Sequence, residues 1–310
     1  MENTIIFTHG IDIDGFGGAI LGNLVFQNPK IVFADNFNLD DLFIENLQKN
    51  PPYENIYITD HCLSYEVCEK IAKCSSIASR LSIFDHHKSR LGKEDKFDFV
   101  HLVVENKKDK QSGTSIFYDY LVNSNLLKPN NALDEFVKLT TLYDTWQWKE
   151  DKKLGEKAYR LNTLFQAVGR ENYIKIVTNV LKRNKDKFEF NDEENKIIDN
   201  FINAFNKKVQ EYINKIQIID LNGLKVGYVE TEDLYKNDIP EALRSQNNPL
   251  NISYVMMPLK DRESVSLRNI EDVNLAEIAS NFGGGGHKYA ASFPKSNPKF
   301  KDLQSSIKIL

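Results

Sequence analysis

Short apolar runs in this chain end in residues that can bind metal ions. Asp85, His86 and His87 follow the run 81–84, and the pair Asp12 and Asp14 follows the run 4–7. Because the carboxyl ends of parallel strands share one edge of an open sheet, side chains far apart in the sequence can meet there. The spacing therefore predicts a metal cluster built from carboxylates and imidazoles.

Three further residues are candidates for the same cluster. His9 precedes Asp12 by three residues, Asp60 follows another apolar run, and Asp144 lies in an aromatic segment. Each aspartate has an ordinary alternative role. The loop aspartates and Asp60 could cap the helices that follow them, and Asp144 could be a turn residue beside a packed tryptophan. His61 could be exposed to solvent, and His101 is expected to be a core or surface histidine.

Oxygen and nitrogen ligands without cysteine suit Mn²⁺ or a similar ion. Two such ions about 3.5–4 Å apart can activate water and stabilise the leaving oxygen of a phosphoester. Phosphoester hydrolysis is therefore the predicted chemistry. Because His86 and His87 are adjacent and point in different directions, we expect one to bind metal and the other to meet the substrate.

The composition predicts a soluble protein of two domains. The 310 residues are 41% hydrophobic and 27% charged, with a net charge of −4, so no basic surface for a long nucleic acid is indicated. The absence of a long apolar stretch or a basic leader favours a cytoplasmic protein. Cys62, Cys68 and Cys74 lack a CxxC spacing and are expected to be reduced, partly buried thiols.

Apolar runs that alternate with helical patterns predict a parallel sheet covered on both faces in the first domain. Strands are expected at 4–8, 31–34, 56–59 and 81–84, and helices at 18–27, 39–48, 64–73 and 112–121. Gly15, Gly17 and Gly18 are expected to form a tight turn before the first helix. The last of these helices opens with Ser112 and Thr114, a candidate anion site.

A helical period from 191 to 216 predicts a long connecting helix. Strands at 225–230, 252–257 and 264–267 and a helix at 275–280 then predict a second α/β domain. It ends in the run Gly283–Gly286 followed by His287, where backbone N–H groups can approach an anion, with a flexible hairpin as the alternative. The expected organisation is a catalytic domain at 1–190, the helix at 191–216 and a substrate-binding domain at 217–310, with the active site in the cleft between the two domains.

These motifs together resemble the DHH phosphoesterase superfamily with a C-terminal DHHA1 domain, over nearly the whole chain. The matching residues are His9, Asp12, Asp14, Asp60, Asp85, His86, His87, Asp144 and the segments 264–268 and 283–287. Segments 8–15 and 143–148 look most like the nanoRNase B (oligoribonuclease) or cyclic-nucleotide phosphodiesterase branch.

The resemblance implies a role for each matching residue. One Mn²⁺ would be bound by His9, Asp12 and Asp60, and a second by Asp14, Asp60, His86 and Asp144, with Mg²⁺ or another divalent ion as the alternative. His87 would meet the scissile phosphate or assist its leaving oxygen, and Asp85 would orient the histidine pair. The implied substrate-binding residues are Arg268, Gly284, Gly285, Gly286, His287, Ser112 and Thr114. Related branches place the first histidine two or four residues before Asp12, so here the loop would bulge or water would complete the first ion.

The implied activity is Mn²⁺-dependent hydrolysis of short RNA or DNA oligonucleotides to nucleoside monophosphates by metal-activated water. Two other activities remain open: hydrolysis of cyclic mononucleotides or linear dinucleotides, and removal of phosphate from 3′-phosphoadenosine 5′-phosphate. A non-enzyme alternative is a catalytically silent nucleotide or RNA-binding module. A pure binder has little use for several aspartates around an anion, because they would repel it without metal. A homodimer through the first domain is also implied, and no membrane partner is expected.

Overall fold

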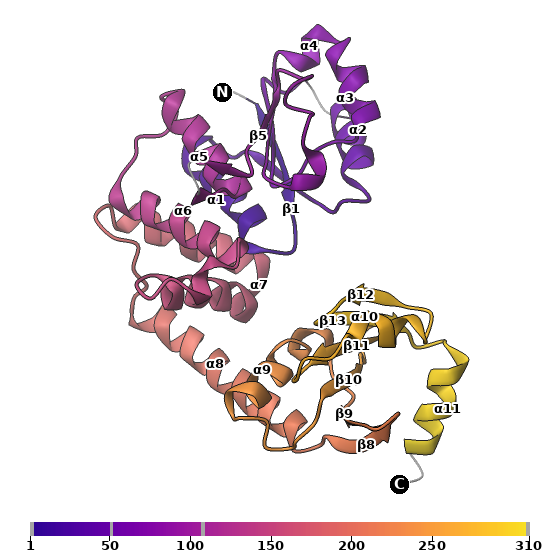
Figure 1. Ribbon diagram of the computed structural model, residues 1–310. Helices are drawn as coiled ribbons and strands as arrows, with labels where there is room; N and C mark the ends of the chain where they lie inside the picture. The colour runs from indigo at the N-terminus through magenta and orange to yellow at the C-terminus, as the bar shows by residue number, and fades with distance from the viewer. Residues whose placement is uncertain (1–2, 50–51, 107–108, 308–310) are drawn as a thin grey trace. The chain divides into compact units, whose positions relative to one another are not determined.

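The computed structural model describes residues 3–49, 52–106 and 109–307. It confirms an α/β fold with two compact units, Met1–Phe201 and Ile202–Leu310 (Figure 1). The unit boundary falls inside one helix. The predicted domain limits of 190 and 217 stay predictions, and their outermost residues, 1–2 and 308–310, lie outside the described ranges.

The first unit is built on a five-stranded sheet in the order β2-β1-β3-β4-β5, and every pairing in it is parallel. The strands are β1 (Thr4–His9), β2 (Lys30–Ala34), β3 (Asn55–Thr59), β4 (Leu81–Asp85) and β5 (Val100–Leu102). Ile58 in β3 lies opposite Phe7 in β1 and Ile83 in β4. Such continuous apolar runs are typical of parallel strands buried on both faces.

Helices cover both faces of this sheet, as predicted (Figure 1). On one face Phe43 and Cys68, from the second and third helices, pack with Phe7 in a single apolar cluster. On the other face the ring of Phe117 lies 5.3 Å from that of Tyr57. The helices are α1 (Ile13–Val25), α2 (Leu39–Lys49), α3 (Tyr65–Ala72), α4 (Ser75–Ala78) and α5 (Gly113–Asn123).

The first helix begins five residues earlier than predicted. Asp12 caps it, since the carboxylate of Asp12 accepts a hydrogen bond of 3.0 Å from the backbone N–H of Gly15. Gly15, Gly17 and Gly18 therefore lie within α1 rather than in a turn before it. They allow the helix to pack closely against its neighbours.

Two helices that the sequence analysis did not predict pack against α1. They are α6 (Asn131–Asp144) and α7 (Gly155–Arg183), the second of which is interrupted at Gly169. The ring of Phe16 in α1 lies 5.0 Å from that of Phe165 in α7. Short elements complete the unit: η1 (Lys88–Arg90), η2 (Gln147–Lys149) and the paired strands β6 (Glu105–Asn106) and β7 (Asp109–Lys110).

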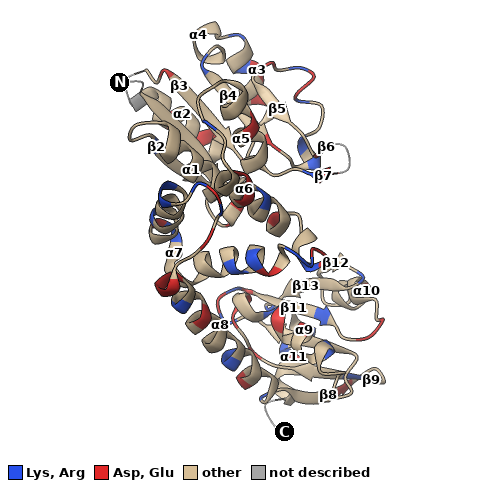
Figure 2. Cartoon of the chain, turned by 90° about the vertical axis from the view of Figure 1, so that its left-hand side faces the viewer, with Lys and Arg blue, Asp and Glu red and all other residues tan. Residues whose placement is uncertain are grey.

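The long helix α8 (Asp192–Ile213) lies where the helical period predicted it. Its first half is held to the first unit by an ion pair of 2.7 Å between Arg160 and Asp199. Basic and acidic residues both occur along its ribbon in Figure 2, as is typical of a helix with an exposed face. No helix within the described ranges is long and apolar enough to cross a membrane.

The second unit contains a six-stranded sheet in the order β12-β13-β11-β10-β9-β8. Met256 faces one apolar cluster and its neighbour Met257 faces the other, so helices cover both faces of this sheet as well. The strands are β8 (Gln217–Leu221), β9 (Leu224–Tyr228), β10 (Tyr254–Pro258), β11 (Ser264–Asn269), β12 (Gly285–His287) and β13 (Ala290–Pro294). The helices are η3 (Asp233–Tyr235), α9 (Asp238–Ser245), α10 (Leu275–Ser280) and α11 (Pro298–Ile307).

Candidate active site

The carboxyl edge of the parallel sheet gathers the predicted metal ligands. β1 ends at His9, Asp60 follows β3, β4 ends at Asp85, and Asp144 is the last residue of α6. The potential ligand atoms form three overlapping groups, each within 4.8 Å: His9, Asp12 and Asp60; Asp14, His86 and Asp144; and Asp60, His86 and His87. Asp144 belongs to a helix, not to the turn that was its alternative assignment.

Asp60 belongs to two of these groups, one with His9 and Asp12 and the other with His86 and His87. Its Oδ2 is 3.5 Å from Nδ1 of His9, and its Oδ1 is 3.4 Å from Nε2 of His86. The two oxygens of one carboxylate thus face different groups, which is the arrangement a bridging ligand needs. The backbone of Asp60 is left-handed, with φ 54°, an uncommon conformation for a residue other than glycine. Ser64, and not Asp60, caps the following helix α3.

The cluster contains buried polar atoms that lack a hydrogen-bond partner among the described residues. They are Oδ2 of Asp60, Nε2 of His86 and Oδ2 of Asp144. Buried groups of this kind are costly unless something satisfies them. Because these atoms converge with other carboxylates, the residues fit divalent cations, which would satisfy them and neutralise the carboxylates.

Electrostatic repulsion among the carboxylates of the cluster also indicates a site for cations. Burial, with the charge of Asp14 nearby, raises the pKa of Asp60 well above its ordinary value. Burial and the same neighbour raise the pKa of Asp144 to about 7. Without a cation, the folded protein therefore favours protonation of some of these carboxyl groups.

His9 reaches the cluster despite its spacing of three residues from Asp12. Its Nδ1–H donates to Oδ2 of Asp12 at 2.6 Å. Burial opposes protonation of this ring, but the hydrogen bond to Asp12 and the negative charges of Asp12 and Asp60 prevail and raise its pKa to about 10. Since Asp12 also caps α1, the capping role and the cluster role apply to the same side chain.

His61, for which exposure to solvent was one possibility, is buried beside His9. Its Nε2–H donates to the backbone oxygen of Ala34 at 3.2 Å, and its ring meets that of His9 edge-on at 5.0 Å. Burial and the neighbouring His9 lower the pKa of His61 to about 4, so the ring is neutral near pH 7. It supports the orientation of His9. The only sequence signal for this role was its position next to Asp60.

The N-terminus of α5 binds an anion, but that anion is the carboxylate of Asp14. The backbone N–H groups of Gly113 and Thr114 donate to Asp14 at 2.7 and 2.9 Å. The hydroxyl of Thr114 donates to the backbone oxygen of Asp14, and Ser112 is paired with Thr141. Ser112 and Thr114 are fully buried. The structure therefore gives Thr114, predicted to bind substrate, contacts that position Asp14, whereas Ser112, predicted to do the same, caps α5 by accepting from the backbone N–H of Ser115.

Asp85 orients both histidines of its motif. Its Oδ1 accepts from the backbone N–H of His86 at 2.8 Å and from Nδ1–H of His87 at 2.7 Å. The hydrogen bond to Asp85 raises the pKa of His87, whose side chain is 50% exposed. His87 is thus the more accessible histidine of the pair. His101, on the neighbouring strand β5, stacks on Phe84 at 5.1 Å and belongs to none of the potential ligand groups among the described residues.

Comparison with known proteins agrees with this geometry. The oligoribonuclease NrnB of Bacillus subtilis (strain 168) is 29% identical over 297 residues, which cover 92% of this chain and 71% of that protein. In sequence and in the residues of its site, the chain is similar to the DHH phosphoesterases. No family model matches the chain.

Two solved structures share the fold of this chain. A pGpG-specific phosphodiesterase, PggH from Vibrio cholerae, has a TM-score of 0.54 at 14% identity, over 99% of both chains. The DHH domain of a member of a family of ribosomal proteins has a TM-score of 0.59 at 14% identity, over 99% of this chain and 87% of that one.

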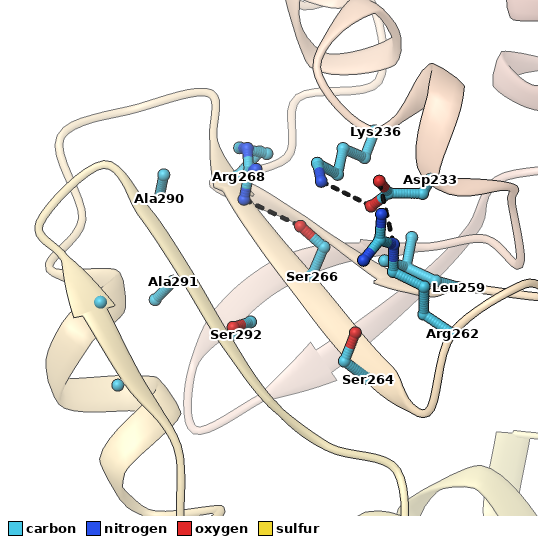
Figure 3. Close-up of a pocket in the computed structure, with 12 residues that line it drawn as sticks. Asp233, Lys236, Leu259, Arg262, Ser264, Ser266, Arg268, Ala290, Ala291 and Ser292 are labelled. Atoms are coloured by element: carbon cyan, nitrogen blue, oxygen red, sulfur yellow. Dashed lines mark hydrogen bonds and ion pairs between the residues drawn. The ribbon is translucent and has the colours of Figure 1, made fainter. Parts of the chain in front are cut away.

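The second unit has a pocket of about 340 Å³ beside the glycine run (Figure 3). Arg268 lines this pocket and donates to neutral groups, Oδ1 of Asn237 at 2.9 Å and Oγ of Ser266 at 2.8 Å. Arg262 and Lys236 also line it, and both are paired with Asp233 (Figure 3). Arg268 is thus the arginine of this pocket whose hydrogen bonds leave its charge available for an anion.

The last two glycines of the run, Gly285 and Gly286, lie in β12, which forms an antiparallel hairpin with β13. Gly285 and Gly286 line the pocket, whereas Gly284 and His287 are not among its lining residues. A Cβ atom at Gly284 would lie 2.1 Å from the backbone oxygen of Ser292, so this glycine is required for packing. His287 is exposed on β12.

Proposed function

We propose that this protein is a metal-dependent phosphodiesterase that hydrolyses short oligonucleotides to nucleoside monophosphates. One observation carries the proposal: Asp60 is shared by two groups of potential ligands, and buried ligand atoms in both lack a partner among the described residues. The likeness to an oligoribonuclease along 92% of the chain supports oligonucleotides as the substrate class.

The cluster would hold two divalent ions, which we propose to be Mn²⁺ because the ligands mix oxygen and nitrogen. His9, Asp12 and Asp60 would bind one ion, and Asp14, Asp60, His86 and Asp144 the other. When bound, the ions supply an activated water and neutralise charge on the phosphate. The buried contacts of Asp14 with the N-terminus of α5 keep its carboxylate in place for this role.

His87 is proposed to act on the substrate directly. Asp85 fixes its ring through Nδ1, so Nε2 is left to face solvent or substrate. Because the same hydrogen bond raises the pKa of His87, the ring is more readily protonated than an ordinary histidine. A protonated ring can donate a hydrogen bond to a phosphate oxygen or a proton to the leaving oxygen.

The second unit is proposed to bind a part of the substrate away from the scissile bond. Arg268 would bind a phosphate together with the backbone of Gly285 and Gly286, which line the same pocket. Gly284 and His287 remain predicted contributors. A cytoplasmic location and a homodimer also stay predictions from the sequence.

A time course with the Mn²⁺-loaded protein tests the proposed function. A 5′-labelled RNA dinucleotide, a longer RNA, cyclic AMP and 3′-phosphoadenosine 5′-phosphate are supplied in parallel. Preferential release of mononucleotide from the dinucleotide is expected. Turnover of only another substrate would assign the protein to that activity, equal rates on long RNA would contradict selection for short chains, and no turnover would favour a nucleotide-binding module.

A further inference from the structure

Trp146 is an exposed aromatic residue two positions beyond the predicted metal ligand Asp144. Its side chain is among the most exposed large apolar groups described, at 63%. Its neighbour Trp148 instead packs between Tyr143 and Tyr159, with ring centroids 5.6 and 5.3 Å away. Trp148 therefore supplies the packing of this segment, and the ring of Trp146 is left for another role.

The backbone holds Trp146 in an unfavourable conformation. Its φ of 61° and ψ of 10° lie in the left-handed region, where glycine or asparagine is usual at the end of a helix. The backbone N–H of Trp146 donates to the oxygen of Tyr143 at 3.1 Å, and Nζ of Lys110 donates to the oxygen of Thr145 at 3.3 Å. A bulky residue that keeps a strained backbone and an exposed ring is a candidate for function.

The backbone of Trp146 lies close to the predicted metal ligand Asp144. Two trans peptide bonds separate the Cα atoms of Asp144 and Trp146 by at most about 7.6 Å. Asp144 itself belongs to the ligand group with Asp14 and His86. In a nucleotide, one sugar separates the base from its phosphate. A phosphate at the cluster would therefore bring an attached base into the neighbourhood of Trp146.

The surroundings of the ring also suit a nucleotide. Nζ of Lys149 lies 5.7 Å from the ring centroid of Trp146, so one ammonium group is near the ring. A single ammonium can cover only one face of the indole, and the exposed fraction of the side chain indicates that much of the ring remains open. Cations beside an aromatic ring are a combination used by proteins that bind single-stranded nucleic acids.

We propose that Trp146 stacks on the nucleobase next to the phosphate that the metal cluster hydrolyses. This inference rests on the proposed function and specifies how its substrate is recognised. Every base has a flat face, so stacking would select nucleotides over other phosphodiesters without a strong preference for sequence. Trp146 is thereby a specificity-determining residue for this chain.

Kinetics of two variants at this position test the proposal. Trp146→Asn removes the ring while keeping a residue that tolerates the left-handed backbone, and Trp146→Phe retains an aromatic face. For an RNA dinucleotide we expect KM to rise about 10-fold in W146N, which corresponds to ~1.4 kcal/mol and lies within the range for base stacking, with kcat little changed. W146F should recover most of the loss. For a dinucleotide that lacks the base beside the scissile phosphate, KM should be the same in all three proteins.

Fluorescence gives a second measurement that does not depend on turnover. The chain has 2 tryptophans, so Trp148→Phe leaves Trp146 as the sole emitter. Titration of this variant, with Mg²⁺ present, should show quenching by 5′-AMP and none by ribose 5-phosphate. Equal quenching by both compounds would contradict stacking on the base.

The results separate the two proposals. Unchanged KM in W146N, or an equal rise in KM for the base-free substrate, would overturn the role of Trp146 while leaving the hydrolase intact. If the wild-type protein hydrolyses no dinucleotide, the proposed function fails, yet selective quenching by 5′-AMP would still support stacking. If the wild-type protein hydrolyses no dinucleotide and 5′-AMP causes no quenching, both the proposed function and the role of Trp146 are overturned.

Discussion

The carboxylate of Asp14 accepts a hydrogen bond of 2.7 Å from the backbone N–H of Gly113, which lies 99 residues further along the chain. The same glycine passes close to Asp60, because a Cβ atom at position 113 would lie 2.5 Å from the backbone nitrogen of Asp60. One helix end thus positions two aspartates of the cluster. The geometry of both proposed ions depends on how closely α5 approaches the sheet edge.

Replacement of Gly113 by alanine is expected to disturb this edge. The new methyl group would meet backbone atoms that cannot rotate away, so Asp60 and Asp14 must shift. We expect stability to fall by about 1–3 kcal/mol, as for other overpacked sites. Mn²⁺ affinity should fall roughly 10- to 100-fold, as when groups that orient ligands are lost.

Urea denaturation and Mn²⁺ titration of G113A measure these effects. Gly285→Ala is the matched control for metal binding, because a Cβ atom at position 285 would meet nothing within 4 Å. Mn²⁺ affinity and stability like those of the wild-type protein in G113A would contradict the close-packing argument.

Asp60→Asn is expected to separate metal binding from folding. The bridging carboxylate is lost, so turnover of a dinucleotide should fall by more than about 100-fold, the upper end of what the loss of an orienting partner causes. In EDTA, however, Tm should rise, because the variant lacks a buried charge whose pKa is raised by burial and by Asp14. Added Mn²⁺ should stabilise the variant less than the wild-type protein.

Differential scanning fluorimetry and metal analysis of D60N provide the readouts. The exposed Asp186 offers a control, since D186N removes one negative charge outside the cluster. Wild-type turnover together with an unchanged metal content in D60N would rule out Asp60 as the bridge.

Stability of the metal-free protein should depend on pH through Asp144. Its pKa of about 7 in the folded protein exceeds the value of about 3.9 expected in the unfolded chain. Between these values the folded state binds a proton that the unfolded state has released, so the free energy of unfolding falls as pH rises from 4 to 7. His9, with a folded pKa of about 10, adds stability below pH 6.5 that is lost as pH rises toward 10.

Thermal unfolding in EDTA from pH 5 to pH 8 tests this dependence. Tm should fall with pH in the wild-type protein and fall less steeply in Asp144→Asn between pH 5 and 7. With Mn²⁺ the trend should weaken or reverse, because metal binding requires deprotonated ligands. If Tm falls equally steeply with pH in D144N and in the wild-type protein in EDTA, Asp144 does not titrate as described.

The sequence was sufficient to predict residues whose roles follow from local position. Asp60 and His86 each follow a short apolar run, and parallel strands deliver the residues after such runs to one edge. Asp144 was a candidate as a carboxylate in an aromatic segment, and the family resemblance supplied its expected place in the second ligand set. Its helix α6 was not predicted, since α6 and α7 lie on α1 and not on the sheet whose alternating pattern guided the analysis.

Long-range contacts account for the remaining differences. His61 is buried because the backbone oxygen of Ala34, on another strand, accepts its N–H. The N-terminus of α5, a candidate anion site in the sequence, holds the carboxylate of Asp14, which comes from α1. In the aromatic segment after Asp144 the sequence indicated a packed tryptophan, and only the fold shows that Trp148 is packed while Trp146 is exposed.

Asp85→Asn should reduce catalysis while leaving metal content close to normal. Asp85 contacts the backbone of His86 and the ring of His87 but belongs to none of the groups that could hold an ion among the described residues. Loss of an orienting carboxylate typically costs about 10- to 100-fold in activity. The measurements are kcat on a dinucleotide and bound Mn²⁺. Loss of metal comparable to that in D60N would show instead that Asp85 holds the ions in place.

Arg268→Ala should weaken substrate binding more than Arg262→Ala, although both arginines line the same pocket. The hydrogen bonds of Arg268 go to neutral groups, whereas Arg262 is 63% exposed and lies 3.1 Å from the carboxylate of Asp233. A hydrogen bond to a charged group contributes about 1.5–3 kcal/mol, so KM for a dinucleotide should rise roughly 10- to 100-fold in R268A. In R262A the change should be less than about threefold, as for an exposed ion pair. Steady-state kinetics of both variants measure KM, and bound metal serves as the control for an intact cluster. Equal effects of the two substitutions on KM would mean that the pocket attracts substrate by its overall charge and not through Arg268.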